Sequence, residues 1–142
     1  MPTGLEVLRG IRDGALPRAP IQDTLGFELA EVDEGRTVFS CVPTEGHLNP
    51  LGTVHGGVAA TLLDSAMGAA VHSTLPEGQA YGTLETKFNL VRAVTPDTGE
   101  LRCEGVVVHR GSRVATAEGR LTRTSDGKLV AHGTSTCLIL DT

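Results

Sequence analysis

One carboxylate, Asp64, stands inside a stretch of small and aliphatic residues that follows a polar, turn-rich segment. The stretch has no proline before Pro76, so it predicts a helix from about Gly56 to Ser73. Burying a carboxylate costs free energy unless the group is paired, hydrogen-bonded or protonated, and active sites often hold carboxylates in such surroundings. Asp64 is therefore a candidate catalytic residue, with an exposed position on the helix as the simpler alternative.

The predicted helix begins at His55-Gly56-Gly57. The first N–H groups of a helix lack partners within it, the helix dipole is positive there, and glycine allows a ligand to approach the backbone closely. Such a helix start can bind a phosphate or stabilise an oxyanion that develops on a carbonyl. The nucleotide-binding patterns GxxxxGK[ST] and GxGxxG are absent, and a plain glycine-rich turn would have the same residues.

The spacing of Gly56 and Asp64 restricts how the two could act together. Eight residues of helix span about 12 Å, whereas a reacting carbonyl must lie within about 3 Å of its hydrogen-bond donor and close to the attacking group. One copy of the helix cannot easily bring both groups to one carbonyl, but two antiparallel copies can. If both residues are catalytic, the sequence predicts a dimer with two sites across its interface.

Composition limits the class of protein. The chain has 142 residues, 39% hydrophobic and 20% charged, with a formal charge of −5, which fits one soluble globular domain over residues 1–142. The acidic balance and the 3% aromatic content disfavour nucleic acid as a partner, and no apolar run is long enough to span a membrane. No signal peptide is expected, and Cys41, Cys103 and Cys137 are interpreted as buried thiols of a cytoplasmic protein.

Hydrophobic periodicity predicts the order of the elements. A short helix over residues 3–10 and a loop over 14–20 make up the N-terminal segment 1–20, and strands follow over 24–32 and 36–42. An irregular segment over 43–53 leads into the central helix, after which four long strands are expected over 80–91, 99–109, 112–123 and 128–140. This order predicts an α+β fold in which a curved antiparallel sheet of about six strands wraps around one long helix.

Two motifs resemble a known family. The pattern Asn49-x5-His55-Gly56-Gly57-x6-Asp64-x2-Met67-Gly68 and the segment that runs from Thr83 to Arg92 are similar to those of the hotdog-fold thioesterases of the phenylacetate-pathway (PaaI) type. The resemblance covers most of the chain and implies hydrolysis of an acyl-CoA thioester to a free acid and CoA, without a metal or redox cofactor. It also implies a homo-oligomer, a dimer or a dimer of dimers.

The resemblance assigns roles to individual residues. Asp64 matches the acidic catalytic residue, which attacks the thioester carbonyl or activates the attacking water, and the Gly56 N–H matches the group that polarises the carbonyl. Asn49 matches a loop amide near the thioester, His55 a residue that shapes the site, and Thr83 a hydroxyl that orients the water. Each has a plainer interpretation: Asn49 as a turn residue, His55 as support for the loop, and Thr83 as a neutral strand position.

Further residues are predicted to bind the substrate. Gly57, Met67 and Gly68 belong to the same helix motif, and some relatives carry a hydroxyl residue where this chain has Gly68. Guanidinium groups suit phosphate oxygens, so Arg92, Arg110 and Arg113 are candidates for holding the phosphates of CoA, with solvated strand-end charges as the alternative.

Two other functions stay open at this point. One is a hotdog module that binds acyl-CoA without hydrolysing it, and the other is a hotdog hydratase or dehydratase. The second would need a paired acid and base, and the nine-residue separation of His55 and Asp64 disfavours such a pair within one chain. The sequence leaves both aliphatic and small aromatic acyl groups possible, and also a carrier protein in place of CoA.

Overall fold

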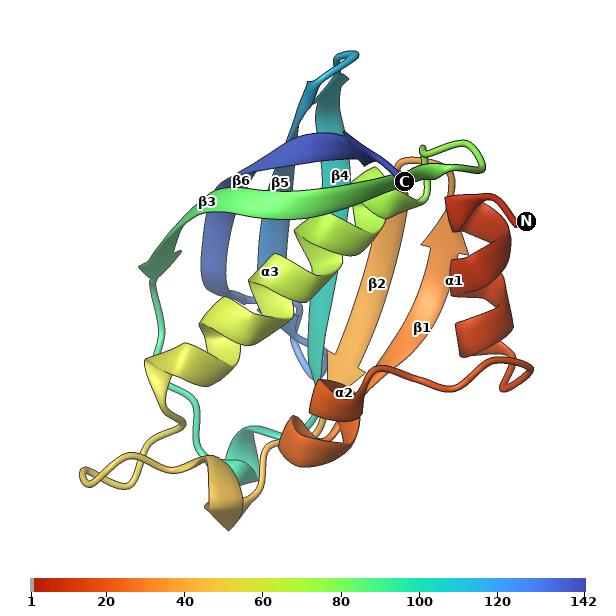
Figure 1. Ribbon diagram of the computed structural model, residues 1–142. Coiled ribbons are helices and arrows are strands. Elements are labelled where there is room, and N and C mark those ends of the chain that lie inside the picture. The colour runs from red at the N-terminus through yellow and green to blue at the C-terminus, as the bar shows by residue number, and fades with distance from the viewer. Residues whose placement is uncertain (1) are drawn as a thin grey trace.

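A computed structural model describes residues 2–142. It contains one six-stranded antiparallel sheet in the order β1-β2-β4-β5-β6-β3, with the long helix α3 across its concave side (Figure 1). The principal elements are α1 (Gly4–Arg12), α2 (Pro20–Leu25), β1 (Phe27–Asp33), β2 (Arg36–Cys41), α3 (Gly56–His72), β3 (Gln79–Leu90), β4 (Leu101–Arg110), β5 (Val114–Arg123) and β6 (Leu129–Asp141). This architecture confirms the predicted α+β fold, a curved sheet wrapped around one central helix.

Helix α3 is nearly all apolar because sheet covers most of its circumference. Leu63, Ala66 and Met67 have no exposed surface, and the backbone carbonyl of Ala66 accepts a 2.8 Å hydrogen bond from the Thr37 hydroxyl on β2. A Cβ added at Gly105 on β4 would lie 2.2 Å from that same carbonyl oxygen. Helix and sheet therefore touch at backbone distance, which a side chain at position 105 would prevent.

The N-terminal segment differs from the prediction. Helix α1 extends two residues further than expected, and Thr3 caps it by accepting a hydrogen bond from the Glu6 N–H at 3.2 Å. A second helix, α2, occupies the start of the region predicted as strand 24–32. Pro20 at the first turn favours helix entry, and Gly26 ends the helix with φ of 71°, so the strand begins only at Phe27.

The remaining elements agree with the sequence within a few residues. The irregular segment after β2 includes a short 3-10 turn, Glu45–His47, and a second such turn, Pro96–Thr98, precedes β4. The three cysteines are free and buried, as expected. Among the described residues, no helix is long and apolar enough to cross a membrane.

Strand β3 forms one edge of the sheet and pairs only with β6 in the described chain. Its register shifts between Thr83 and Glu85, which marks a β-bulge. Leu84, inside the bulge, and Leu90, at the end of the strand, are exposed hydrophobic residues at 61% and 57%. The unpaired edge thus carries two exposed leucines among polar and charged residues.

Candidate active site

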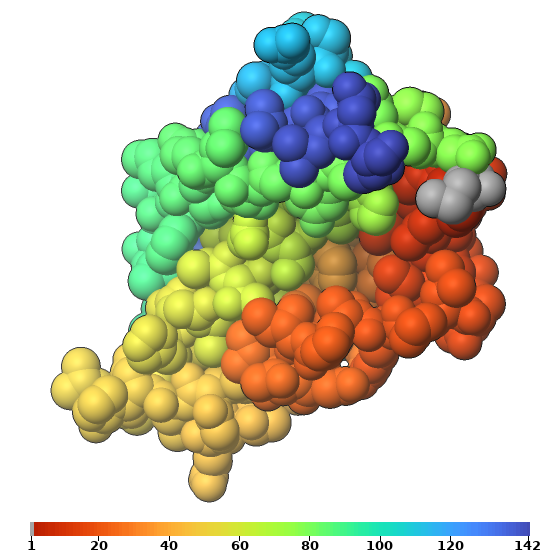
Figure 2. Space-filling view, viewed as in Figure 1, coloured from red at the N-terminus to blue at the C-terminus, as the bar shows by residue number. Residues whose placement is uncertain are grey.

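Asp64 lies on the one face of α3 that the sheet leaves uncovered. The prediction that its carboxylate is buried is wrong for the single chain, because Thr61, Asp64 and Ser65 form a strip of helix surface that is not buried. Figure 2 shows this part of α3 at the surface, between β3 and the N-terminal segment. We refer to this depression as the Asp64 groove; its lining residues include Ile21, Thr61, Ser65 and Phe88.

Two threonines of β3 hold the Asp64 carboxylate. The hydroxyl of Thr83 donates to Asp64 Oδ1 at 3.1 Å, and the hydroxyl of Thr86 reaches the same oxygen at 3.5 Å. Residues three apart on a regular strand point to opposite faces, but the bulge between Thr83 and Glu85 turns both hydroxyls toward the helix. The structure thus brings together the predicted residues Asp64 and Thr83 and adds Thr86, which sequence reasoning missed.

The start of α3 presents a free backbone donor. His55 is the N-cap residue, and its Nδ1 accepts a 2.8 Å hydrogen bond from the Gly57 N–H. The Gly56 N–H, by contrast, has no acceptor within residues 2–142. Since the positive end of the helix dipole lies here, the Gly56 N–H is available to an external carbonyl or anion, while His55 positions the turn.

Asn49 shapes the loop that precedes this turn. Its side-chain Oδ1 accepts from the backbone N–H groups of Leu51 at 2.9 Å and Thr53 at 3.2 Å, and its Nδ2 donates to the Thr53 hydroxyl at 2.8 Å. All the polar atoms of this side chain are therefore engaged within the loop. Asn49 nevertheless lies at the rim of the cavity that contains Gly56.

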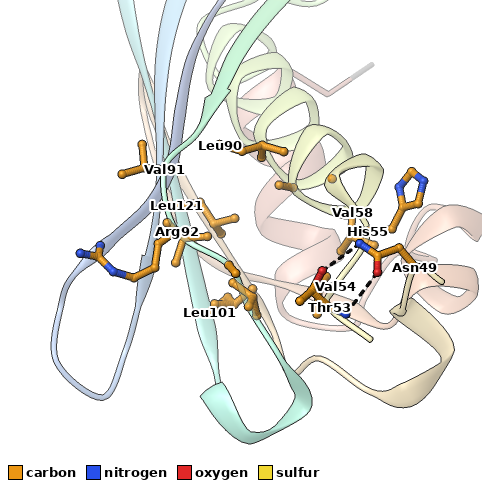
Figure 3. A pocket seen from close by; sticks show the side chains of 15 residues that line it. Asn49, Thr53, Val54, His55, Val58, Leu90, Val91, Arg92, Leu101 and Leu121 are labelled. Atoms are coloured by element: carbon orange, nitrogen blue, oxygen red, sulfur yellow. Dashed lines mark hydrogen bonds between the residues drawn. The ribbon is translucent and has the colours of Figure 1, made fainter. Parts of the chain in front are cut away.

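A cavity of about 310 Å³ opens beside Gly56. Its walls are mainly apolar and come from α3, from the segment after β3 and from the strands of the sheet; they include Val58, Leu90, Val94, Leu101, Leu121 and Val130. His55 also lines the cavity, and Figure 3 shows its ring turned away from these apolar side chains. We refer to this space as the Gly56 cavity.

Of the other helix positions named by the family motif, Met67 and Gly68 face the protein interior and Gly57 does not. Met67 has no exposed surface, and it packs beneath Gly119 of β5. Gly68 lies against the ring of Tyr81, where an added Cβ would approach the ring to 2.9 Å. Gly57 is exposed, and its N–H is occupied by His55.

The three candidate arginines lie at opposite ends of the sheet. Arg92 follows the end of β3 and donates to the Leu129 carbonyl at 2.6 Å. Arg110 donates at 3.0 Å to the Gln79 side chain at the start of β3, and the exposed Arg113 lies in the adjoining β4–β5 turn. Twelve residues of strand separate the two groups by roughly 35–40 Å, so one CoA could not contact all three arginines within a single chain.

Gly56 and Asp64 are also too far apart within one chain to act on one carbonyl. Both lie on α3, which is a regular helix from Gly56 to His72. The two residues are thus separated by about 12 Å along the helix axis, as predicted. A single chain supplies a carboxylate site at one point of the helix and a carbonyl-binding donor at another.

Comparison with known proteins places this fold and these residues in a family. The model of the Thioesterase superfamily matches residues 51–130, more than half of the chain, and this range includes Gly56, Asp64 and Thr83. A phenylacetic acid degradation-related protein of Ralstonia eutropha JMP134 has a similar solved structure, with a TM-score of 0.83 and 32% identity over 93% of this chain and 98% of that one.

Two sequence relatives are more limited in extent. A Halobacterium salinarum protein is 45% identical over 67 residues, which cover 47% of this chain and 44% of that protein. Acyl-coenzyme A thioesterase 13 of Mus musculus is 36% identical over 93 residues, which cover 65% of this chain and 64% of that protein. The chain spans less than two thirds of either relative. The family match and the shared architecture confirm the resemblance and the hotdog fold, and the chain belongs to the Thioesterase superfamily.

Proposed function

We propose that the chain hydrolyses an acyl-CoA thioester to a free acid and CoA, with Asp64 as the acidic catalytic residue. The observation that carries the proposal is the Asp64 carboxylate, which stands in an open groove and is held by the hydroxyls of Thr83 and Thr86. The superfamily match and the mouse acyl-coenzyme A thioesterase 13 support the choice of a thioester as the substrate.

The chemistry follows from what each group can offer. Asp64 either removes a proton from water as the water oxygen attacks the thioester carbonyl, or attacks that carbonyl itself to form an anhydride that water then opens. In both routes the C–S bond breaks, CoA leaves as the thiolate and takes up a proton, and the acyl group leaves as a carboxylic acid. The Thr83 and Thr86 hydroxyls hold Oδ1 of the carboxylate, which orients Oδ2 toward the substrate.

The oxyanion that forms on the carbonyl needs a donor, and the Gly56 N–H has no other acceptor in the described chain. Donors fixed in advance where charge develops are a large part of catalysis by acyl-transfer enzymes. Because Gly56 lies too far from Asp64 on its own helix, we assign this role to the partner's Gly56 in a dimer.

The edge strand β3 supports the arrangement of that dimer. An unpaired edge with exposed Leu84, Leu90 and Val91 is suited to pairing with a second strand. Antiparallel pairing of two β3 strands about a two-fold axis would set the two α3 helices antiparallel. Each Asp64 would then approach the partner's Gly56, and Arg92 would approach the partner's Arg110 and the partner's Arg113, which could share the phosphates of one CoA.

Thiol release from a panel of acyl-CoAs tests the activity. We expect the wild type to release CoA and Asp64→Asn to lose turnover by a factor of at least about a hundred, since the amide can neither accept the proton nor attack. Asp97→Asn is the matched control, because Asp97 is an exposed residue in the turn before β4. Unchanged turnover in Asp64→Asn would remove Asp64 from the mechanism. If the wild type released CoA from no thioester, the proposed hydrolysis of acyl-CoA would be rejected.

A further inference from the structure

A second cavity, of about 190 Å³, lies beneath the N-terminal helices. Its walls are largely apolar and come from α1, β1 and β2, and they include Leu8, Ile11, Phe27, Leu29 and Phe39. We refer to it as the N-terminal cavity. It is separate from the Gly56 cavity, with which it shares no residue.

The N-terminal cavity adjoins the Asp64 groove. Ile21 of α2 and Ser65 of α3 line both spaces, and Ser65 is the residue directly after Asp64. A group whose carbonyl lies at the Asp64 carboxylate can therefore extend between Ile21 and Ser65 into the cavity.

The wall of the cavity also carries polar atoms that the described chain does not use. The rings of Tyr81 and His72 are in contact, with centroids 5.5 Å apart, and neither side chain has a hydrogen-bond partner within residues 2–142. Burial, and to a lesser extent the charge of Asp64, raises the pKa of Tyr81 to about 12, so its hydroxyl stays protonated and can donate. Burial also lowers the pKa of His72, which favours the neutral imidazole, with one donor and one acceptor.

Local contacts hold the roof of the cavity in place. The Gly4 N–H of α1 donates to the Leu75 carbonyl at 3.0 Å, and the Ala19 N–H donates to the Gln22 side chain at 3.0 Å. Arg18 forms ion pairs with Asp23 and with Glu28, which tie the loop before α2 to β1. These contacts anchor α1 and the loop before α2 over the cavity.

The volume of the N-terminal cavity limits the size of the group that can bind there. A cavity of about 150 Å³ is enough for benzene, so the N-terminal cavity, which is somewhat larger and opens to the Asp64 groove, has room for about six to eight non-hydrogen atoms. We propose that the N-terminal cavity is the acyl subsite, and that it selects a compact acyl group whose far end carries a hydroxyl or similar polar group bonded by Tyr81. This proposal rests on the thioesterase function proposed above and names the substrate class of that site.

Three substrates and one variant test it: hexanoyl-CoA, 6-hydroxyhexanoyl-CoA and decanoyl-CoA, with wild type and Tyr81→Phe. We expect the wild type to prefer the hydroxylated over the plain six-carbon chain by about two- to tenfold in kcat/KM, the range of one net hydrogen bond. Tyr81→Phe should lose this preference while hexanoyl-CoA changes by less than about twofold. An equal loss on both six-carbon substrates, or a preference that survives in Tyr81→Phe, would overturn the role of Tyr81.

A pair of cavity-filling variants tests the location. Ala69→Val narrows the N-terminal cavity and Ala93→Leu narrows the Gly56 cavity. With butanoyl-CoA added to the panel, we expect Ala69→Val to move the optimum to this shorter chain. Ala93→Leu should leave the chain-length order intact, with decanoyl-CoA the poorest substrate throughout. A shift caused by Ala93→Leu alone, or a wild type that favours decanoyl-CoA, would place the acyl group elsewhere.

The location can also be tested without turnover. The chain has one tyrosine and no tryptophan, so its intrinsic fluorescence reports on Tyr81 alone. Titration with 6-hydroxyhexanamide, an aliphatic amide that does not absorb where tyrosine does, should change this fluorescence in a saturable way, and Ala69→Val should weaken it. If the wild type hydrolyses no thioester, the proposed function fails, but this titration still tests whether the N-terminal cavity binds a compact hydroxylated group. The absence of a saturable change would overturn the proposed subsite.

Discussion

Replacing Gly56 with proline tests the proposed division of the site between two chains. Gly56 is the first residue of α3, the position where proline is most easily accepted because its missing N–H has no partner in the helix. His55 has φ of −59° and ψ of 136°, which is the conformation that a residue before proline prefers. An added Cβ would meet only the end of the Leu90 side chain, at 2.8 Å, and that side chain is 57% exposed and can move aside.

The substitution therefore keeps the helix start but removes one backbone donor and places the proline Cδ where the N–H pointed. Loss of one oxyanion donor lowers kcat by about a hundred- to a thousandfold in acyl-transfer enzymes, so Gly56→Pro homodimers should retain at most about a hundredth of wild-type turnover. Asp64→Asn homodimers should be comparably inactive. Each variant alone shows only that its residue is needed for turnover. A mixed dimer of the two variants is needed to show whether the two residues act across chains.

A mixed dimer distinguishes the two geometries. If each site combines Asp64 of one chain with the partner's Gly56, a dimer of one Asp64→Asn chain and one Gly56→Pro chain has one site with both groups intact. Its turnover should be about half that of the wild-type dimer, because a two-fold dimer has two equivalent sites. A dimer of the doubly substituted chain with a wild-type chain should be inactive, since each of its sites then lacks one group.

The assay needs two tags and one substrate. The two chains are expressed together with different affinity tags, the mixed dimer is purified through both tags, its mass in solution is verified, and CoA release is followed. If both groups of a site came from one chain, the two outcomes would exchange. The dimer of an Asp64→Asn chain with a Gly56→Pro chain would be inactive, and the dimer of a doubly substituted chain with a wild-type chain would be half active. That exchange, or a protein that stays monomeric, would refute the cross-chain site.

Three further results follow from the structure. Thr83→Val should lower kcat by up to about tenfold with little change in KM, because Asp64 loses a hydrogen bond; an unchanged kcat in stopped assays would contradict this. Gly105→Ala should lower the free energy of unfolding by about 1–3 kcal/mol or more, measured by urea denaturation, while Gly82→Ala, whose Cβ would have only an ordinary contact at 4.0 Å, should not. Tyr81 should titrate near 12 in the native state by tyrosinate absorbance. Since unfolded tyrosine ionises near 10, the free energy of unfolding should fall by about 2 kcal/mol as the pH rises from 10 to 12, and Tyr81→Phe should remove that fall.

The central helix and the later strands could be predicted because their patterns are long and uninterrupted. Helix α3 begins at Gly56, as predicted, and ends one residue earlier than expected, and β5 ends at Arg123, where the alternation of residues ends. The family motif singled out both Asp64 and Thr83, and the structure joins them by a 3.1 Å hydrogen bond that the motif did not specify. These features depend on local periodicity or on a motif, both of which a single sequence contains.

What the sequence could not show depends on register and on contacts between distant segments. Thr86 reaches Asp64 only because the bulge in β3 shifts the alternation by one residue, and nothing in a run of β-branched and polar residues marks that shift. Helix α2 is six residues long, too short for periodicity to reveal, although Pro20 and Gly26 at its ends are recognisable boundary signals in retrospect.

The exposure of Asp64 and the exposed leucines on the edge of β3 have one explanation in common. The sequence predicted a buried carboxylate because the residues around Asp64 are aliphatic, yet in one chain the carboxylate faces an open groove. In the same chain Leu84 and Leu90 lie exposed on an unpaired edge strand beside that groove. A second copy paired along β3 would cover both features at once. It would exclude water from the carboxylate and strengthen its interaction with a developing oxyanion, because electrostatic interactions are stronger where water is excluded. The prediction of a buried Asp64, which is wrong for the single chain, is then itself a reason to expect the dimer.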